Sequence, residues 1–203
     1  PANAFVVEPG PTAGVPRGVT WVFKAEELPA DLRPDVVVLA VKPQMMDAAA
    51  PAFRPLVGKG ALVLSVAAGK TIGAYESYFG ATTPVVRAMP NTPAAVGRGA
   101  SVLIANANVS QAQRQLAEQM LAAVGTVDWI TDEALMHVVT AMSGGGPAYV
   151  FLLIETLAAS GAKLGLPEDL AMRLARTTVS GSGELARLAP EPAAQLRQNV
   201  TSP

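Results

Sequence analysis

The stretch Asp35–Val41 (DVVVLAV) decides the fold class of this 203-residue chain. It is almost entirely Val and Leu, and an apolar run without polar alternation is typical of a strand buried on both faces of a parallel sheet. Lys42 and Pro43 end this run, and a similar one, ALVLSVA at 61–67, ends in Ala68-Gly69. These two runs predict a parallel sheet with helices on both faces.

Working outward, short apolar runs alternate with helical patterns. We expect further strands at 4–7, 19–23, 84–88, 100–105 and 126–130, and helices at 44–57 (with a break near Pro51), 72–79 and 111–124. Thr71 and Ser110 are suitable N-caps for the last two helices. Strands alternating with helices indicate βαβ units. From Thr131 onward no strand is evident, and helices are expected at 133–142, 147–164, 167–188 and 191–200. We therefore predict an α/β domain at 1–131 and an all-α domain at 132–203.

The second half contains the loop SGGGP at 143–147, followed by an apolar helix that is interrupted only by Glu155 up to Thr156. Glycines allow backbone to approach a neighbour closely, and proline suits the first turn of a helix. A helix that is apolar all round is expected to be buried on every side. The loop is therefore either a tight helix–helix turn or a place where a ligand meets backbone.

Composition narrows the function. Half of the residues are apolar, the net charge is −1 and there is no cysteine, which argues against nucleic acid or an anionic membrane as the main partner. The apolar runs are shorter than the roughly 18 residues of a membrane span, and no signal peptide is expected. A reducing cytoplasm is compatible with the absence of cysteine.

The sequence contains little evidence for a metal site or for a serine hydrolase. One histidine, His137, lies in a predicted helix, where a structural or surface role is favoured over catalysis, and no His/Cys ligand set exists. The serine-hydrolase motif G-x-S-x-G does not occur. Glu155 is expected to pair with a polar group, because an unpaired buried carboxylate is costly.

Three predicted strands end in unusual loops, at 40–43 (AVKP), 67–69 (AAG) and 89–93 (MPNTP). Ligands of open parallel sheets bind outside the carboxyl ends of the strands, so the three loops together predict a dinucleotide site. The glycine fingerprint of such sites is missing, and GSGELA at 181–186 is rejected because it lies in a helical pattern. The strand 4–7, which ends at Glu8, is interpreted as the second strand of a Rossmann unit. The first strand and its glycine turn are then expected upstream of Pro1.

Six motifs occur in a characteristic order: AVKPQ (40–44), SVAAG (65–69), VVRAMPNTPAAVGRGA (85–100), SGGGPAYVF (143–151), KLGLP (163–167) and NVTSP (199–203). Over essentially the whole chain this order resembles the pyrroline-5-carboxylate reductases, which perform the last step of proline biosynthesis. The resemblance implies a Rossmann-like parallel-sheet domain, incomplete at its N-terminus, and an all-α dimerisation and substrate-binding domain. It also implies reduction of 1-pyrroline-5-carboxylate to L-proline by NADPH or NADH, in a cytoplasmic homodimer or higher homo-oligomer.

The resemblance further implies roles for individual residues. The catalytic candidate is Thr140, which matches a family threonine near the imine nitrogen. The residues expected at the cofactor are Ala40, Val41, Lys42, Pro43, Val66, Ala67, Ala68, Asn91, Ser143 and Gly144. Those expected at the substrate are Gly145, Gly146, Val200, Thr201 and Ser202, of which the last three begin a loop, TSPGGTT in the family, that the partner subunit contributes.

Departures from the family pattern qualify these expectations. The glycine turn and the end of the carboxylate loop are missing, so we expect a fragment that needs its missing ends for activity. Gly145 stands where the family often has Ser, and Glu191 only approximately matches a family acid and is given no role. Glu8 favours a free ribose 2′-hydroxyl, whereas Thr12 and Arg17 would suit a 2′-phosphate, which leaves the cofactor preference open.

Two other functions stay open at this point. A related hydroxyacid or sugar-acid dehydrogenase would also join a Rossmann domain to a helical one. Such enzymes use a lysine in the first interdomain helix, and 133–142 contains none. The third possibility is a non-catalytic assembly module built from the helical half, suggested by the apolar helix that begins at Pro147.

Overall fold

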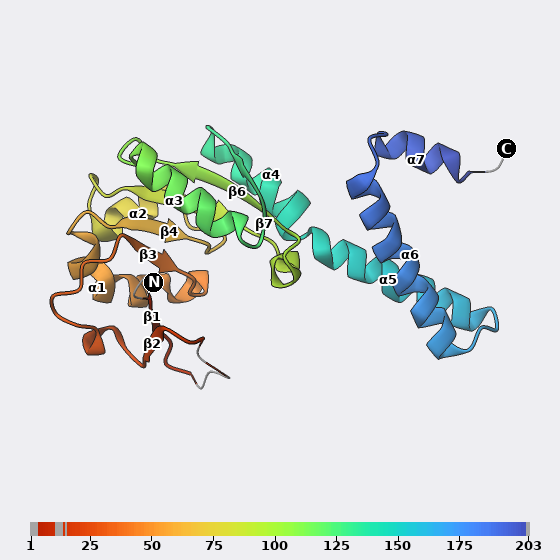
Figure 1. The fold of residues 1–203 in the computed structure, drawn as a ribbon, viewed down its shortest axis with the longest axis horizontal. Coiled ribbons are helices and arrows are strands. Elements are labelled where there is room, and N and C mark those ends of the chain that lie inside the picture. Colours follow the sequence, from red (N-terminus) through yellow and green to blue (C-terminus); the bar gives the residue numbers. More distant parts are fainter. Residues whose placement is uncertain (1–3, 11–13, 15, 202–203) are drawn as a thin grey trace. The chain divides into compact units, whose positions relative to one another are not determined.

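The structure, a computed structural model, describes residues 4–10, 14 and 16–201. It divides into two compact units, Pro1–Gly144 and Gly145–Pro203 (Figure 1). The boundary expected at residue 131 lies before this division, because the segment 133–144 belongs to the sheet unit: Met136 is fully buried there, and Glu133 forms an ion pair with Arg87.

The first unit contains two sheets. β1 (Ala4–Val7) and β2 (Val19–Val22) pair in parallel, and a second sheet has the order β3-β4-β5-β6-β7. Its strands are Val36–Leu39, Leu62–Ser65, Val85–Met89, Gly99–Ala105 and Gly125–Trp129. Among the described residues, β1 pairs only with β2, and β3 pairs only with β4. All seven strands expected from the sequence are therefore present.

The sheet is parallel, as predicted, except at one pair of strands. β5 and β6 are antiparallel, whereas β3–β4, β4–β5 and β6–β7 are parallel. A parallel crossover needs about a dozen residues or more, and only residues 90–98, with the 3₁₀ helix η3 (Thr92–Val96), join β5 to β6. The short MPNTP connection therefore returns the chain in the opposite direction.

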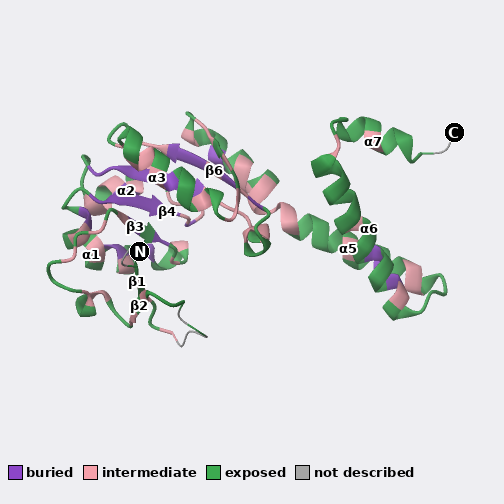
Figure 2. Ribbon diagram, viewed as in Figure 1, coloured by how far each residue is buried: buried purple, intermediate pink, exposed green. Residues whose placement is uncertain are grey.

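Helices cover both faces of the five-stranded sheet (Figures 1 and 2). On one face, α1 (Met46–Val57) and α2 (Ile72–Phe79) pack with Met46 and Tyr75 against β3, β4 and β5. On the other, α3 (Gln111–Ala122) packs with Ala117 against β4, β5 and β6. Buried residues concentrate in these strands (Figure 2), so the core lies in the sheet.

The local signals for these helices are mostly confirmed. The Thr71 hydroxyl accepts the Ala74 amide, and Ser110 forms a capping box with Gln113. The break expected near Pro51 does not occur, because α1 continues through Pro51 and Pro55. Burial of Met46, Ala50 and Val57 against the sheet compensates for the hydrogen bonds that proline cannot donate.

The remaining short helices are η1 (Ala25–Glu27), η2 (Pro43–Met45) and the consecutive turns η4 (Glu133–Leu135), α4 (Met136–Val139) and η5 (Thr140–Gly144). η5 is a π-helix, a wider turn that is rare and frequently found at functional sites. GSGELA lies inside a long helix of the second unit, α6, which agrees with its rejection as a nucleotide fingerprint.

The second unit consists of α5 (Gly146–Lys163), α6 (Glu168–Leu188) and α7 (Ala193–Asn199). α5 and α6 pack on each other through small residues: Ala158, Ala171 and Ala175 are buried, and Gly161 lies beside Ala171. The expectation that the helix after Pro147 is buried on every side is wrong for the single chain. Its large apolar side chains are at least 43% exposed at Tyr149, Val150, Phe151, Leu152, Leu153 and Leu157.

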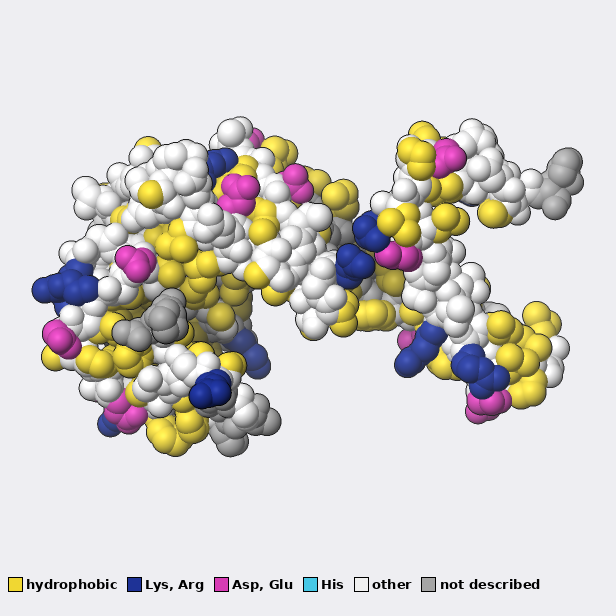
Figure 3. Space-filling view, in the orientation of Figure 1, with side chains coloured by type: hydrophobic (Ala, Val, Ile, Leu, Met, Phe, Trp, Pro, Cys, Tyr) yellow, Lys and Arg dark blue, Asp and Glu magenta, His cyan; other side chains and the backbone are white. Residues whose placement is uncertain are grey.

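The helical segment Glu133–Lys163 is long and apolar enough to cross a membrane, judged by length and composition alone. The uninterrupted apolar runs considered in the sequence are shorter than this segment, because polar residues such as Glu155 interrupt it. Figure 3 shows hydrophobic side chains gathered in several places on the surface of the helical unit. Such a surface requires an apolar partner of some kind.

Candidate functional site

The loops after β3, β4 and β5 lie at one edge of the sheet. Leu39 pairs with Ser65, and Ser65 pairs with Arg87, in neighbouring parallel strands. The Val66 amide also donates to the Leu39 carbonyl at 3.1 Å. The loops at 40–43, 66–69 and 90–93 therefore begin side by side, as the sequence predicted.

The first two loops differ in exposure. Ala40 and Lys42 are exposed, and Val41 and Pro43 are half-buried at the beginning of η2. In the loop after β4, Ala67 is buried and donates its amide to the Ser65 hydroxyl at 3.2 Å, and Gly69 has a φ of +79°. A left-handed glycine behind two alanines keeps side chains away from this backbone, which fits a flat ring or a ribose lying against the loop.

Asn91, in the loop after β5, connects two segments. Its side-chain oxygen accepts the Ala100 amide at 2.9 Å. Its Nδ2 donates to the carbonyl and to the hydroxyl of Ser143, both at 3.3 Å. Asn91 thus joins the MPNTP loop to the beginning of the triple-glycine motif, two sequence features that are far apart along the chain.

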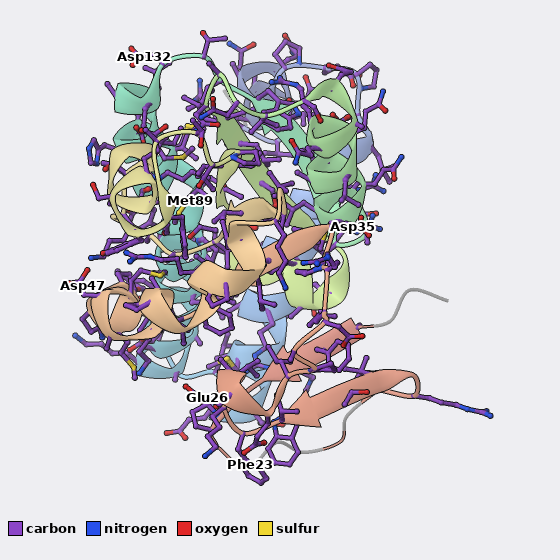
Figure 4. The ribbon with its side chains drawn as sticks, turned by 90° about the vertical axis from the view of Figure 1, so that its left-hand side faces the viewer. Phe23, Glu26, Asp35, Asp47, Met89 and Asp132 are labelled. Carbon is purple, nitrogen blue, oxygen red and sulfur yellow. The ribbon has the colours of Figure 1, made fainter. Side chains whose placement is uncertain are left out.

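Gly144 lies against Met89, the last residue of β5. A Cβ added at Gly144 would stand 2.3 Å from the Met89 Cε, so a side chain at this position would displace the methionine. Met89 is half-buried, and Figure 4 labels it. The glycine therefore lets this backbone lie close to the Met89 side chain, and a larger residue would make the flexible methionine move.

Thr140 is the first residue of the π-helical turn η5 and is half-buried. Its hydroxyl donates to the Met136 carbonyl at 2.8 Å, a bond that Thr often makes within a helix. The oxygen retains acceptor capacity, and the proton can be redirected by rotation about the Cβ–Oγ1 bond. Thr140 and Ser143 therefore lie on the same short segment, with Ser143 held at Asn91.

A charged cluster lies between the first two loops. Lys70 donates to Asp47 of α1 at 2.9 Å and to the Tyr78 hydroxyl at 3.0 Å, and Tyr78 also donates to Asp47. The hydrogen bond from Tyr78 lowers the pKa of Asp47, and the bond to Asp47 raises the pKa of Lys70. Figure 4 shows Asp47 at the outer side of α1. Beneath the cluster, burial raises the pKa of Tyr75, which shares a hydrogen bond with Ser65.

The residues considered for cofactor preference lie after β1. The Glu8 carboxylate accepts the Gly10 amide at 2.9 Å, and Arg17 is exposed. Thr12 lies outside the described residues. Phe23, beyond the end of β2, is 54% exposed and contacts Trp21 (Figure 4).

The residues expected at the substrate belong to the second unit. Gly145 and Gly146 are half-buried, Val200 and Thr201 are exposed, and Ser202 lies outside the described residues. His137 is exposed, in agreement with a surface role.

Sequence reasoning missed Arg87 and Glu133 as parts of the site, whereas Met89 lies in the predicted loop 89–93. Arg87 is 3% exposed and pairs with Glu133 at 2.8 Å. The signal was available, because a single charge inside the apolar strand VVRAM requires a partner. Nothing in the sequence indicates which carboxylate is the partner of Arg87.

These features define a Rossmann-like α/β protein with a helical second unit and a candidate ligand site at the carboxyl edge of its sheet. Comparison with known proteins is specific. Residues 133–203 match the family pattern described as pyrroline-5-carboxylate reductase dimerisation. The pyrroline-5-carboxylate reductase of Pseudomonas aeruginosa is 48% identical over 83% of this chain and 62% of its own length. That of Pisum sativum is 40% identical over 83% and 61%.

Solved structures agree. The pyrroline-5-carboxylate reductase of Coxiella burnetii superposes with a TM-score of 0.82 at 38% identity, covering 92% of this chain and 68% of that one. The Plasmodium falciparum enzyme, with NADP bound, gives 0.84 at 32% identity, covering 98% and 73%. The chain belongs to the pyrroline-5-carboxylate reductase family. It spans a little less than two thirds of the length of the curated relatives it matches.

Proposed function

We propose that this chain is part of an enzyme that reduces 1-pyrroline-5-carboxylate to L-proline with NADPH or NADH. The observation that carries the proposal is the bond from Asn91 to Ser143, because it holds the triple-glycine segment at the carboxyl edge of the sheet. The names of the relatives support the choice of substrate. In this proposal the α/β unit binds the cofactor, and the helical unit forms the dimer.

The cofactor would lie along the three loops, with the backbone of 40–43 and 66–68 against it and Asn91 and Ser143 at its reactive end. The NADP-bound relative supports this assignment. Bound NAD(P)H supplies the hydride that adds to the imine carbon. Preference between the two cofactors depends on Glu8 and Arg17, because a carboxylate favours a free 2′-hydroxyl and a guanidinium favours a 2′-phosphate.

The protein's own chemistry would be to orient the imine and to provide a proton for its nitrogen. Thr140 is the candidate, since its hydroxyl sits on the segment that Asn91 holds, and rotation away from the Met136 carbonyl frees the O–H.

The helical unit would form a homodimer or higher homo-oligomer, and the match of 133–203 to a dimerisation region supports this. The exposed apolar side chains of α5 would then lie in an interface between copies rather than in lipid. Val200, Thr201 and Ser202 of the partner, with Gly145 and Gly146, would hold the substrate carboxylate. We propose that the assembled enzyme works in the cytoplasm.

The proposal is tested on the full-length enzyme by following NAD(P)H absorbance with 1-pyrroline-5-carboxylate. We expect consumption of the cofactor and formation of one proline per cofactor oxidised. The test variant is Asn91→Asp, which keeps the acceptor for the Ala100 amide but cannot donate to Ser143. The matched control is Asn108→Asp, because the Asn108 side-chain amide donates to the carbonyls of Ala81 and Thr83. Only the first should lower kcat. No proline from the wild-type enzyme with either cofactor would contradict the proposal.

A further inference from the structure

One carboxylate oxygen joins three elements of the first unit. Oε1 of Glu133 accepts from Nη1 of Arg87 at 2.8 Å and from the Ile72 amide at 2.9 Å. Glu133 is the first residue of η4, Arg87 lies in β5, and Ile72 begins α2. The start of the segment 133–144 is therefore fixed to a strand and to a helix at once.

Arg87 needs the hydrogen bond to Glu133 because its guanidinium is buried. Its side chain is 3% exposed, whereas that of Glu133 is 30% exposed. Arg87 is also the register partner of Ser65, beneath the loops. A buried guanidinium without a counter-charge is strongly unfavourable. Any displacement of Glu133 away from Arg87 therefore meets a steep cost, which makes this contact a firm anchor.

The other end of the same segment reaches the candidate site. Ser143 accepts from Asn91, and Gly144 packs on Met89, two residues beyond Arg87 in the same strand. Thr140 lies between the two attachments. Figure 4 labels Asp132 at the beginning of this segment and Met89 at the end of β5. The segment is therefore attached at both of its ends, which restricts rotation and sliding of the turn that carries Thr140.

We propose that Glu133 is a positioning residue: through Arg87 and the Ile72 amide it fixes the segment that carries Thr140 and Ser143 against the loops after β4 and β5. The proposal rests on the reductase function proposed above for its kinetic consequences. Glu133 touches neither substrate nor cofactor in this role. Its effect on the reaction comes entirely from the geometry of other residues.

The direct test is Glu133→Gln in the full-length enzyme. The amide oxygen can still accept from Ile72, but it gives Arg87 no counter-charge. We expect kcat to fall about tenfold to a hundredfold, as small misplacements of reacting groups do, while the Kd of the cofactor stays within about twofold. The matched control is Glu118→Gln, since exposed Glu118 of α3 accepts one bond from Trp129 and its change should leave both constants unaltered.

A second variant separates positioning from stability. Arg87→Met combined with Glu133→Gln removes the uncompensated charge, and replacing both members of a buried ion pair is often tolerated. We expect the thermal midpoint to recover toward the wild-type value while kcat, measured per cofactor-binding site, stays low. Recovery of kcat together with the midpoint would show that Glu133 only stabilises the fold.

Hydrogen exchange provides a readout that does not depend on the reaction. Amides of 136–144 should exchange faster in Glu133→Gln than in wild type, and Glu118→Gln should not change them. Unchanged exchange in this segment would overturn the positioning role. If wild type forms no proline, the function fails, and the exchange result still decides the role of Glu133.

Discussion

At the scale of single residues, the site is defined by side chains that hold backbone in place. Asn91 uses its oxygen for Ala100 and its nitrogen for Ser143, and Gly144 leaves room for Met89. Thr140 differs from both, because its hydroxyl serves only its own helix in this structure. It is thus the side chain whose removal should affect chemistry with little effect on the fold.

We therefore predict that Thr140→Val lowers kcat of the full-length enzyme by about a hundredfold, within the range of a lost proton donor. The thermal midpoint should change little, because valine fills the same volume and the lost bond is local. Thr140→Ser is the control and should retain most of the activity. Equal losses in the valine and serine variants would indicate that the methyl group, not the hydroxyl, matters.

At the scale of elements, the helices of the second unit carry glycines in two different environments. Gly161 in α5 faces Leu166 and Ala171, where an added Cβ would stand 3.2 Å and 3.4 Å from side-chain carbons. Gly183 in α6 has no atom within 4 Å of an added Cβ. Glycine inside a helix lowers the free energy of unfolding by about 1 kcal/mol relative to alanine. Of these two positions, Gly183 is the one where alanine would meet no other atom of the chain.

Gly183→Ala should accordingly raise the thermal midpoint by about 2–4 °C, and Gly161→Ala should raise it less or lower it. Calorimetry on the full-length enzyme measures both. A lower midpoint for Gly183→Ala, together with a weaker oligomer by light scattering, would place Gly183 in a tight contact between copies. That result would refute the prediction of a simple gain.

At the scale of the whole molecule, we expect the exposed apolar surface of α5 to govern association with a second copy. Phe151 is 61% exposed and lines a cavity of about 540 Å³ with Glu155, Met172 and Arg176. Interfaces of obligate homodimers resemble a protein core divided in two. A charge placed at Phe151 would be buried without a partner on association.

Phe151→Glu is therefore predicted to convert the oligomer to monomers and to abolish activity, if the partner contributes to the substrate site. Mass from light scattering and the NAD(P)H assay measure the two effects. Met120→Glu, at a 37% exposed position on α3, is the matched control and should leave both unchanged. A Phe151→Glu protein that remains an active oligomer would contradict this assignment of the surface.

Much of the fold could be predicted from local patterns. Runs such as DVVVLAV and caps such as Ser110 depend on neighbours in sequence, and the structure confirms the strand and the cap, although Val38 is exposed where burial on both faces was predicted. The antiparallel β5–β6 pair was missed because it depends on the length of a connection, not on the pattern of either strand. The pairing of Arg87 with Glu133 was missed because the two are distant in sequence. The exposure of α5 could not be predicted from its apolar pattern, because the pattern does not tell whether the rest of the chain or a second copy covers the helix.

The unpaired edges of the two sheets have a consequence for handling a preparation of these residues. β1 and β3 each have one side without a strand partner among the described residues, and β3 is a short, uncharged run of β-branched residues with Val38 44% exposed. Open edges of this composition are templates for cross-β stacking. A preparation limited to residues 1–203 should therefore form thioflavin-binding aggregates on warming, and a charged substitution at Val38 should delay them.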